Sequence, residues 1–154
     1  MSQRIGVIDM GTNTFHLLIT DIIDAKPLIL VNEKSAVGLG KGGINTNIIT
    51  EEAIERALTT LRAFRVVLDS YAVEHIIATG TSAIRSATNK QQLIDCIKKE
   101  VNIDVEVING EREAELIFRG VQQAIPMEEK TSLAMDIGGG SVEFIIGNSK
   151  EIIW

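Results

Sequence analysis

The first third of the chain consists of three runs rich in apolar and β-branched residues, separated by short polar turns. The runs cover Arg4–Asp9, Phe15–Asp21 and Pro27–Val37, and their composition predicts three β-strands. Because only short turns join them, we expect neighbouring strands to pair antiparallel in a meander. A glycine-rich segment, Gly38–Asn47, follows and is predicted to be an irregular loop.

The pattern then changes to helical spacing. Apolar residues recur every three or four positions from Ala53 to Leu68, which predicts a long amphipathic helix, and Thr50 is a suitable N-cap for it. Thr79–Arg85 is predicted to be a loop rich in small hydroxylic residues. The other elements that we expect are strands at 75–78 and 104–108 and helices at 89–101 and 111–124.

The resulting order, βββαβαβα, predicts an α/β fold with a mixed five-stranded sheet and helices on its faces. In such sheets the loops at the carboxyl ends of parallel strands meet in one crevice. Asp9, the Thr79–Arg85 loop and the Asn109–Glu113 turn should therefore share one edge of the sheet.

A polar, proline-containing break at 126–130 divides the chain, and the strand pattern restarts at Thr131–Asp136 and Val142–Gly147. Glu151–Trp154 has the pattern of a third strand cut short. We therefore expect residues 1–125 to form an N-terminal domain and residues 126–154 to begin a second, similar domain that is truncated here.

Two segments repeat the same sequence pattern: IGVIDMGTNTFHLL at 5–18 and LAMDIGGGSVEFII at 133–146. In both, an apolar run ends in an aspartate, a glycine follows two positions later, and a second apolar run resumes after small polar residues. One copy alone is often an ordinary hairpin turn. Its recurrence in the same frame favours a shared function, because a buried strand that ends in a carboxylate is costly unless the charge has a partner.

Phosphate binding is the chemistry that this pattern suggests. Glycine lets the N–H groups of a tight turn converge on an anion, and hydroxyl groups add donors. The predicted phosphate-binding residues are Gly11, Thr12, Asn13, Thr14, Gly138, Gly139, Gly140 and Ser141. Asp9, Asp136 and Glu143 are the expected magnesium ligands, acting through water.

Hydrophobic content, cysteine count and net charge together limit the classes of protein to which this chain can belong. A 45% hydrophobic content and a mean hydropathy of +0.17 indicate a folded protein, and the apolar runs are too short to span a membrane. The polar N-terminus does not resemble a signal peptide, and a single cysteine, Cys96, suits a reducing cytoplasm. A net charge of −6 argues against non-specific nucleic-acid or membrane binding. A polyanionic ligand would therefore need local basic residues and a divalent cation.

Four motifs occur together: Asp9–Thr14, Thr79–Arg85, Asn109–Ala114 and Asp136–Glu143. In this order they resemble the exopolyphosphatase and guanosine pentaphosphate phosphohydrolase (Ppx/GppA) family of the actin, hexokinase and chaperone ATPase superfamily. The resemblance implies an actin-like ATPase (ribonuclease H-like) fold. It also implies magnesium-dependent release of a terminal phosphate from polyphosphate or from guanosine pentaphosphate, in a cleft between two domains. The implied binding partners are polyphosphate or guanosine penta/tetraphosphate.

The resemblance also implies roles for two side chains: Glu113 as the catalytic base and Arg85 as a phosphate ligand. Burial or nearby anions would raise the pKa of Glu113, as suits a base near neutrality. Each residue also has a plainer interpretation, because Glu113 lies in a first helical turn and Arg85 is a loop cation. His16 and His75 are predicted to be structural, since neither has a suitably spaced partner ligand.

Two other functions stay open at this point: a small-molecule kinase of the same superfamily, and a non-catalytic sensor of phosphate or of the alarmone. The two phosphohydrolase substrates cannot be separated from these residues. A homodimer through exposed edge strands is also open. If one wall of the cleft is absent, we expect the chain alone to bind phosphate weakly and to turn over slowly or not at all.

Overall fold

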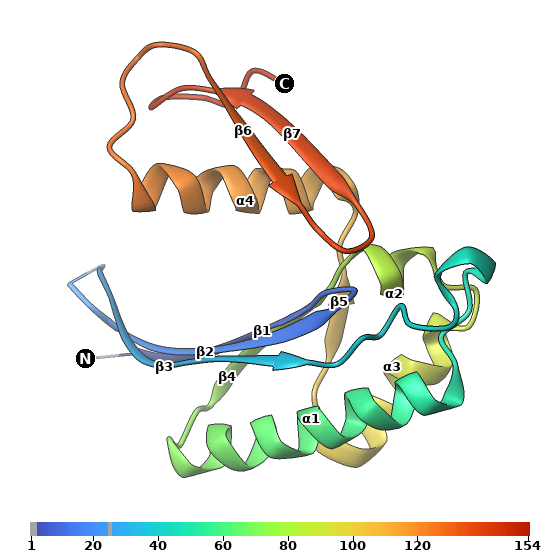
Figure 1. Cartoon of the computed structure of the whole chain (residues 1–154). Helices are drawn as coiled ribbons and strands as arrows, with labels where there is room; N and C mark the ends of the chain where they lie inside the picture. The colour runs from blue at the N-terminus through green and yellow to red at the C-terminus, as the bar shows by residue number, and fades with distance from the viewer. Residues whose placement is uncertain (1–2, 25) are drawn as a thin grey trace.

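A mixed five-stranded sheet is the centre of the computed structural model, which describes residues 3–24 and 26–154 (Figure 1). Its strand order is β3-β2-β1-β4-β5; β1, β2 and β3 pair antiparallel, whereas β4 pairs parallel with both β1 and β5. The predicted meander and mixed sheet are thus confirmed. The strands are β1 Gln3–Met10, β2 Thr14–Ile23, β3 Lys26–Ala36, β4 His75–Gly80 and β5 Val105–Val107.

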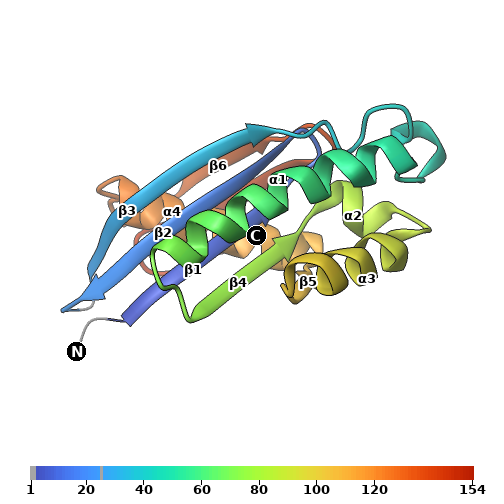
Figure 2. The same ribbon diagram turned by 90° about the horizontal axis from the view of Figure 1, so that it is seen from below.

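Two helices, α1 (Glu51–Ser70) and α3 (Lys90–Val101), cover one face of this sheet (Figure 2). The Thr50 side chain caps α1 by accepting a hydrogen bond from the Ala53 amide at 3.2 Å. Two acidic residues in the first turn further stabilise the helix N-terminus. The predicted start of this helix is therefore confirmed.

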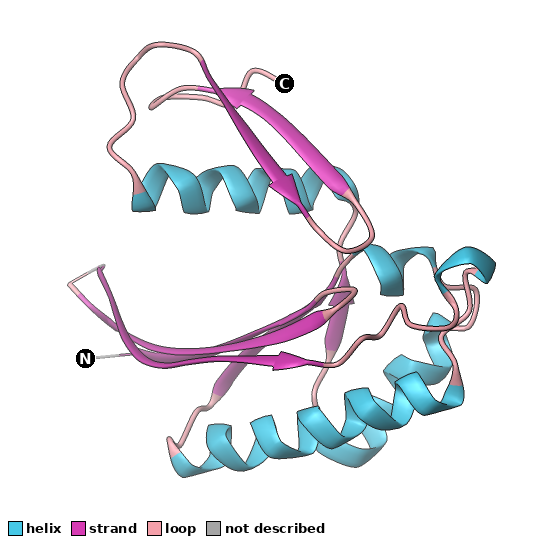
Figure 3. Cartoon of the chain, in the orientation of Figure 1, coloured by secondary structure: helices cyan, strands magenta, loops and turns pink. Residues whose placement is uncertain are grey.

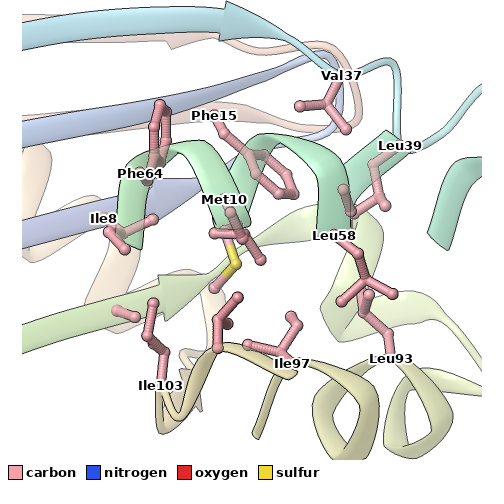
Figure 4. Packing of buried hydrophobic residues seen from close by; sticks show 14 of the residues in the cluster. Ile8, Met10, Phe15, Val37, Leu39, Leu58, Phe64, Leu93, Ile97 and Ile103 are labelled. Atoms are coloured by element: carbon pink, nitrogen blue, oxygen red, sulfur yellow. The ribbon is translucent and has the colours of Figure 1, made fainter. Parts of the chain in front are cut away.

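The core lies between that face and the two helices (Figure 4). Alternate residues of the first hairpin point into it, because successive side chains of a strand lie on opposite faces. Ile8 and Met10 of β1 and Phe15 of β2 are fully buried, and Phe64 of α1 packs in the same cluster. Truncating a buried phenylalanine such as Phe64 to alanine would cost about 3–5 kcal/mol of stability.

Two predictions for the connecting segments need correction. Thr79–Arg85 is not a loop: β4 extends to Gly80, and α2 (Ser82–Ser86) begins soon after. The Arg85 amide donates to the Thr81 carbonyl at 2.8 Å, so the small residues form one helical turn. The Gly38–Asn47 loop is irregular as expected, but it contains a short 3₁₀ helix at Ile44–Thr46.

A second sheet, consisting of β6 (Ser132–Ile137) and β7 (Val142–Gly147), lies on the other side of the first sheet with α4 (Gly110–Ala124) (Figure 3). Helix α4 was expected to cover the five-stranded sheet, but it packs mainly against β7 and β6. Phe118 of α4 is fully buried, and a Cβ atom on Gly147 would lie 2.5 Å from its ring. This close contact holds α4 against the β6–β7 hairpin.

The chain beyond β7 turns back along that strand. Gly147 and Ile152 form an isolated antiparallel bridge, and the Ile153 amide donates to the Ile146 carbonyl at 2.7 Å. The third strand expected at Glu151–Trp154 is therefore present only as this short pairing.

Candidate active site

The two repeated segments form two hairpin turns with the same construction. In the β1–β2 hairpin Asp9 lies opposite His16, and in the β6–β7 hairpin Asp136 lies opposite Glu143. Each turn is closed by a 3.0 Å hydrogen bond from a glycine amide to a carbonyl three residues later, Gly11 to Thr14 and Gly138 to Ser141. The duplicated sequence pattern thus corresponds to duplicated local structure.

The two turns lie against each other. Figure 1 shows the β6–β7 turn above α2 and the end of the first hairpin. A Cβ atom on Gly140 would lie 2.5 Å from Thr12 Oγ1 and 2.8 Å from Ser82 Oγ, and one on Gly139 would collide with the Asn13 amide group. A larger residue at either position would force these neighbouring side chains to shift, so the glycines of the second turn allow its close contact with the first.

Several backbone amides in these turns have no partner within the described part of the chain. The Gly11 and Gly138 amides close the turns and are not available to an anion. The amides of Thr12, Asn13, Gly139, Gly140 and Ser141 donate no backbone hydrogen bond among the described residues. Of the predicted phosphate-binding glycines, Gly11 and Gly138 therefore shape the turns, while the residues that follow them offer N–H groups.

Backbone hydrogen bonds from the segment after β3 hold the first turn in its conformation. The Asn13 carbonyl accepts hydrogen bonds from the Val37 and Gly38 amides at 2.9 and 2.8 Å, and the Thr12 carbonyl accepts one from Gly40 at 3.0 Å. With its carbonyl oxygens engaged, this turn needs no rearrangement to receive an anion. The Gly38–Asn47 loop thus supports the site through the backbone.

A cavity of about 410 Å³ opens between the two turns. Both turns line it, from Gly11 to Thr14 and from Gly138 to Ser141, together with four carboxylates and a few other side chains. The carboxylates are Asp9, Glu113, Asp136 and Glu143, and the others are His16, Lys34, Thr81, Ser82 and Ile137. Every residue of the predicted site except Arg85 therefore lines this cavity.

Asp9 and Asp136 interact across this cavity. Crowding by protein atoms raises the pKa of Asp9 above its usual value, and the Asp136 charge raises it further, while His16 offsets part of the effect. The two motif aspartates therefore face one gap, which is the arrangement that the sequence repeat required.

Glu113 lies in the first turn of α4, whose N-cap, Asn109, accepts a hydrogen bond from the Arg112 amide at 2.8 Å. Partial burial raises the pKa of Glu113. A hydrogen bond from Arg85 opposes this rise, and the charges of Glu143 and Asp9 add to it. A carboxylate that is more basic than usual and borders an anion-binding cavity is suited to general-base chemistry.

Arg85 has a different position from the one expected. It lies on α2, and its Nη1 donates to Glu113 Oε2 at 2.7 Å and to the Ile108 carbonyl at 3.1 Å. It is not among the described residues that line the cavity. Its guanidinium group therefore holds the Glu113 carboxylate in the structure.

The carboxylates suit magnesium, which prefers oxygen ligands and usually retains several waters. Asp136 and Glu143 lie directly opposite each other on β6 and β7, where two like charges repel. A cation between them would remove that cost. Within residues 3–24 and 26–154, however, no three His, Cys, Asp or Glu side chains are close enough to enclose a metal ion directly.

Sequence reasoning missed four polar lining residues: His16, Lys34, Thr81 and Ser82. His16 was expected to be structural, but it lies opposite Asp9 on one side and Lys34 on the other. The strand register could have placed Lys34 beside the site, since residues directly opposite in a sheet share a face. Thr81 and Ser82 lie within the Thr79–Arg85 motif, but the sequence analysis assigned neither of them a role.

Comparisons with known proteins agree with this site. A profile of the Ppx/GppA phosphatase family matches residues 18–153. The crystal structure of an exopolyphosphatase from Cytophaga hutchinsonii superposes with a TM-score of 0.97 at 78% identity, over 99% of this chain and 49% of that one. Among curated proteins, exopolyphosphatase 1 of Mycobacterium tuberculosis is 30% identical over 97% of this chain and 44% of its own length.

A third relative has a different name. Guanosine-5'-triphosphate,3'-diphosphate pyrophosphatase of Vibrio vulnificus is 35% identical over 97% of this chain and 30% of its own length. The chain thus spans about half the length of the matched structure, and less of these two curated relatives. Its fold is the actin-like ATPase fold, as predicted. With the family profile matched over most of its length, the chain belongs to the Ppx/GppA phosphatase family.

Proposed function

We propose that this chain supplies the catalytic base and the phosphate-binding turns of a magnesium-dependent phosphohydrolase. Its substrates would be inorganic polyphosphate, guanosine pentaphosphate or both, and the product would be the terminal phosphate. One observation carries the proposal: Glu113 borders the same cavity as the two turns, each of which has several backbone amides without a protein partner among the described residues.

The turns would bind the terminal phosphate and orient it. Open amides at Thr12, Asn13 and Gly139 to Ser141 would donate hydrogen bonds to its non-bridging oxygens. These donors are fixed before the reaction, so they stabilise the developing charge without reorganisation. Asp9, Asp136 and Glu143 would hold magnesium through water, and the cation would neutralise charge on the phosphate oxygens.

Glu113 would act on the attacking water. It would accept a proton as the water oxygen bonds to the terminal phosphorus and the phosphoanhydride bond opposite it breaks, with the shortened chain leaving as an anion. The ion pair with Arg85 fixes the position of the carboxylate and limits the rise of its pKa. Arg85 is therefore proposed as a positioning residue and not as a direct phosphate ligand.

The relatives' names support this substrate class. One matched structure and one curated relative are exopolyphosphatases, and another curated relative is a guanosine pentaphosphate pyrophosphatase. Substrates of both types end in a phosphoanhydride, which is the only part that the cavity described above needs to hold. Either substrate is compatible with these residues.

Replacing Glu113 with glutamine tests the proposal, with Glu111→Gln as the matched control on the same helical turn. Glu111 is exposed and lies outside the cavity. With excess protein, orthophosphate should be released from polyphosphate only when Mg²⁺ is present, and Glu113→Gln should slow release about 100-fold or more, as expected for a general base. Tight substrate binding without any release would instead favour a non-catalytic sensor.

Self-association is proposed as a further property. One face of the β6–β7 hairpin is exposed, although the equivalent face of the first hairpin is buried beneath α1. Its members with roughly half or more of their surface exposed are Leu133, Met135, Ile137, Val142 and Phe144. Among the described residues β6 pairs only with β7, so its outer edge can pair with a second copy of the chain.

No helix in the described part of the chain is long and apolar enough to cross a membrane. Cys96 is half-buried and packs against the core. A cytoplasmic location remains part of the proposal and rests on this single cysteine.

A further inference from the structure

A row of polar residues crosses four neighbouring strands of the five-stranded sheet, β3, β2, β1 and β4, on the face away from α1. Strand register places Lys34 opposite His16, His16 opposite Asp9, and Asp9 opposite Thr79. Residues directly opposite in a sheet point to the same side. The row therefore leads from Asp9, which lines the cavity, to Lys34 on the edge strand β3.

Lys34 is the only described cavity-lining residue that carries a permanent positive charge. Four carboxylates line the same cavity, and the whole chain has a net charge of −6. Lys34 is exposed, and its ammonium group forms no ion pair or hydrogen bond with any described residue. Because no protein carboxylate pairs with this ammonium group, it is available to an anionic ligand that enters the cavity.

Arg85 does not fill this role in the arrangement observed. Its Nη1 is engaged by Glu113 and by the Ile108 carbonyl, and it lies outside the cavity lining. The positive charge that a polyanion requires is therefore supplied on the opposite side of Asp9, from β3. Sequence motifs did not indicate this, because Lys34 belongs to none of them.

His16 provides a second contact beside Lys34. Its Nε2 lies 2.8 Å from Asn32 Oδ1, and this hydrogen bond fixes the orientation of the imidazole ring. The ring lines the cavity between Asp9 and Lys34. The free ammonium group of Lys34 can donate to a phosphate oxygen, and the imidazole ring held beside it on the adjacent strand adds contact surface for the same ligand.

We propose that Lys34 and His16 form a subsite for the phosphate group next to the one held by the turns, so that the site prefers linear chains over orthophosphate. Lys34 lies two strands from Asp9, which separates their backbones by about 10 Å. A phosphate held by the turns lies on the Asp9 side of this separation, whereas a short phosphate chain spans it. This inference rests on the proposed function, because it extends the same site.

Calorimetric binding of tripolyphosphate and orthophosphate to the 154-residue chain tests the subsite. Lys34→Gln should weaken tripolyphosphate binding about three- to tenfold, as expected for one charge-assisted contact, and leave orthophosphate binding unchanged. His16→Gln should show the same selectivity with a smaller loss. Lys34→Arg should retain most of the affinity, because the charge remains.

The matched control is Lys26→Gln, at the other end of β3, where the residue is exposed and away from the cavity. It should bind tripolyphosphate like the unaltered chain. Three results would overturn the subsite: unaltered tripolyphosphate binding in Lys34→Gln, an equal loss for orthophosphate, or no tripolyphosphate binding by the unaltered chain. If the chain binds tripolyphosphate through Lys34 but releases no phosphate, the subsite stands and the proposed hydrolysis fails.

Discussion

Arg85 Nη1 lies 2.7 Å from Glu113 Oε2, and this ion pair joins α2, next to the first hairpin, to the first turn of α4, which packs against the second hairpin. The same Nη1 also donates to the Ile108 carbonyl, immediately before the N-cap of α4. The contact therefore links the two halves of the site and fixes the carboxylate that we propose as the base.

Arg85→Gln should lower both stability and activity. Glu113 would lose its charged partner while most of its side chain stays shielded, since only 14% of it is exposed. We expect a loss of about 1 kcal/mol in the free energy of unfolding, allowing for solvent screening. The pKa of Glu113 should rise further, so the acid limb of the pH–rate profile should move to higher pH.

Urea unfolding and a pH–rate series check this prediction. Arg65→Gln is the matched control, because Arg65 is exposed to a similar degree, 26% against 27%, but pairs with Asp69 on the surface of α1. Arg65→Gln should lower the free energy of unfolding by no more than about 0.5 kcal/mol. Equal stability losses in the two variants, with an unmoved pH profile, would contradict the role assigned to Arg85.

Asp9→Asn should stabilise the fold near neutral pH. The pKa of Asp9 is raised in the folded state, chiefly by burial, so the folded protein binds this proton more tightly than the unfolded chain does. Stability therefore falls as pH rises from the usual Asp pKa of 3.8 through the folded pKa, and stays lower above it. Asparagine carries no charge and avoids this loss.

Because Asp9 is exposed by surface area, solvent screens much of this effect, and we expect Asp9→Asn to raise the Tm at pH 7 by only about 1–2 °C, corresponding to about 0.5 kcal/mol in a domain of this size. The gain should shrink as the pH is lowered and should vanish below the unfolded pKa. Asp95→Asn, on the exposed surface of α3, is the control and should leave the Tm unchanged. A lower Tm for Asp9→Asn at pH 7 would show that its charge is stabilised in the fold.

Gly140→Ala should separate the two turns. The added methyl group would lie 2.5 Å from Thr12 Oγ1, which is too close, and Thr12 is itself buried. The second turn must therefore move away, and binding of tripolyphosphate should weaken about tenfold or more. Gly120→Ala is the control: its Cβ would meet nothing within 4 Å on α4, so stability should rise by about 0.5–1 kcal/mol with unchanged binding. Normal ligand binding by Gly140→Ala would argue against the packed turns.

Met135→Lys should reduce self-association. Met135 is 55% exposed in the middle of the edge strand β6, where a lysine opposes edge-to-edge pairing. Sedimentation velocity over a range of concentrations should show a dimer for the unaltered chain and a monomer for this variant. Val66→Lys, at an exposed apolar position on α1, should stay dimeric. A monomer at every concentration for the unaltered chain would refute the proposed dimer.

Local signals in the sequence predicted much of this structure. The repeat around Asp9 and Asp136 indicated two equivalent turns, because aspartate and glycine at fixed spacing are tied to one backbone geometry. Thr50 and the helical period predicted the start and the buried face of α1. Glu113 was placed at the site by a family motif, and the structure puts it beside the cavity.

Features that depend on tertiary packing were harder to predict. The amphipathic pattern of α4 shows that one face is buried but not which sheet buries it, and Phe118 packs against Gly147 of the hairpin. The position of Arg85 depends on its contact with Glu113, 28 residues away. Lys34 reaches the site only through the register of β3 on β2, which no local pattern specifies.

Single-turnover release of orthophosphate from long-chain polyphosphate by the 154-residue chain, with and without Mg²⁺, tests the central claim most directly. We predict slow, magnesium-dependent release that is nearly abolished in Glu113→Gln and retained in Glu111→Gln, while both variants still bind the substrate. Release at the same rate from Glu113→Gln, or release that does not require a divalent cation, would contradict the account.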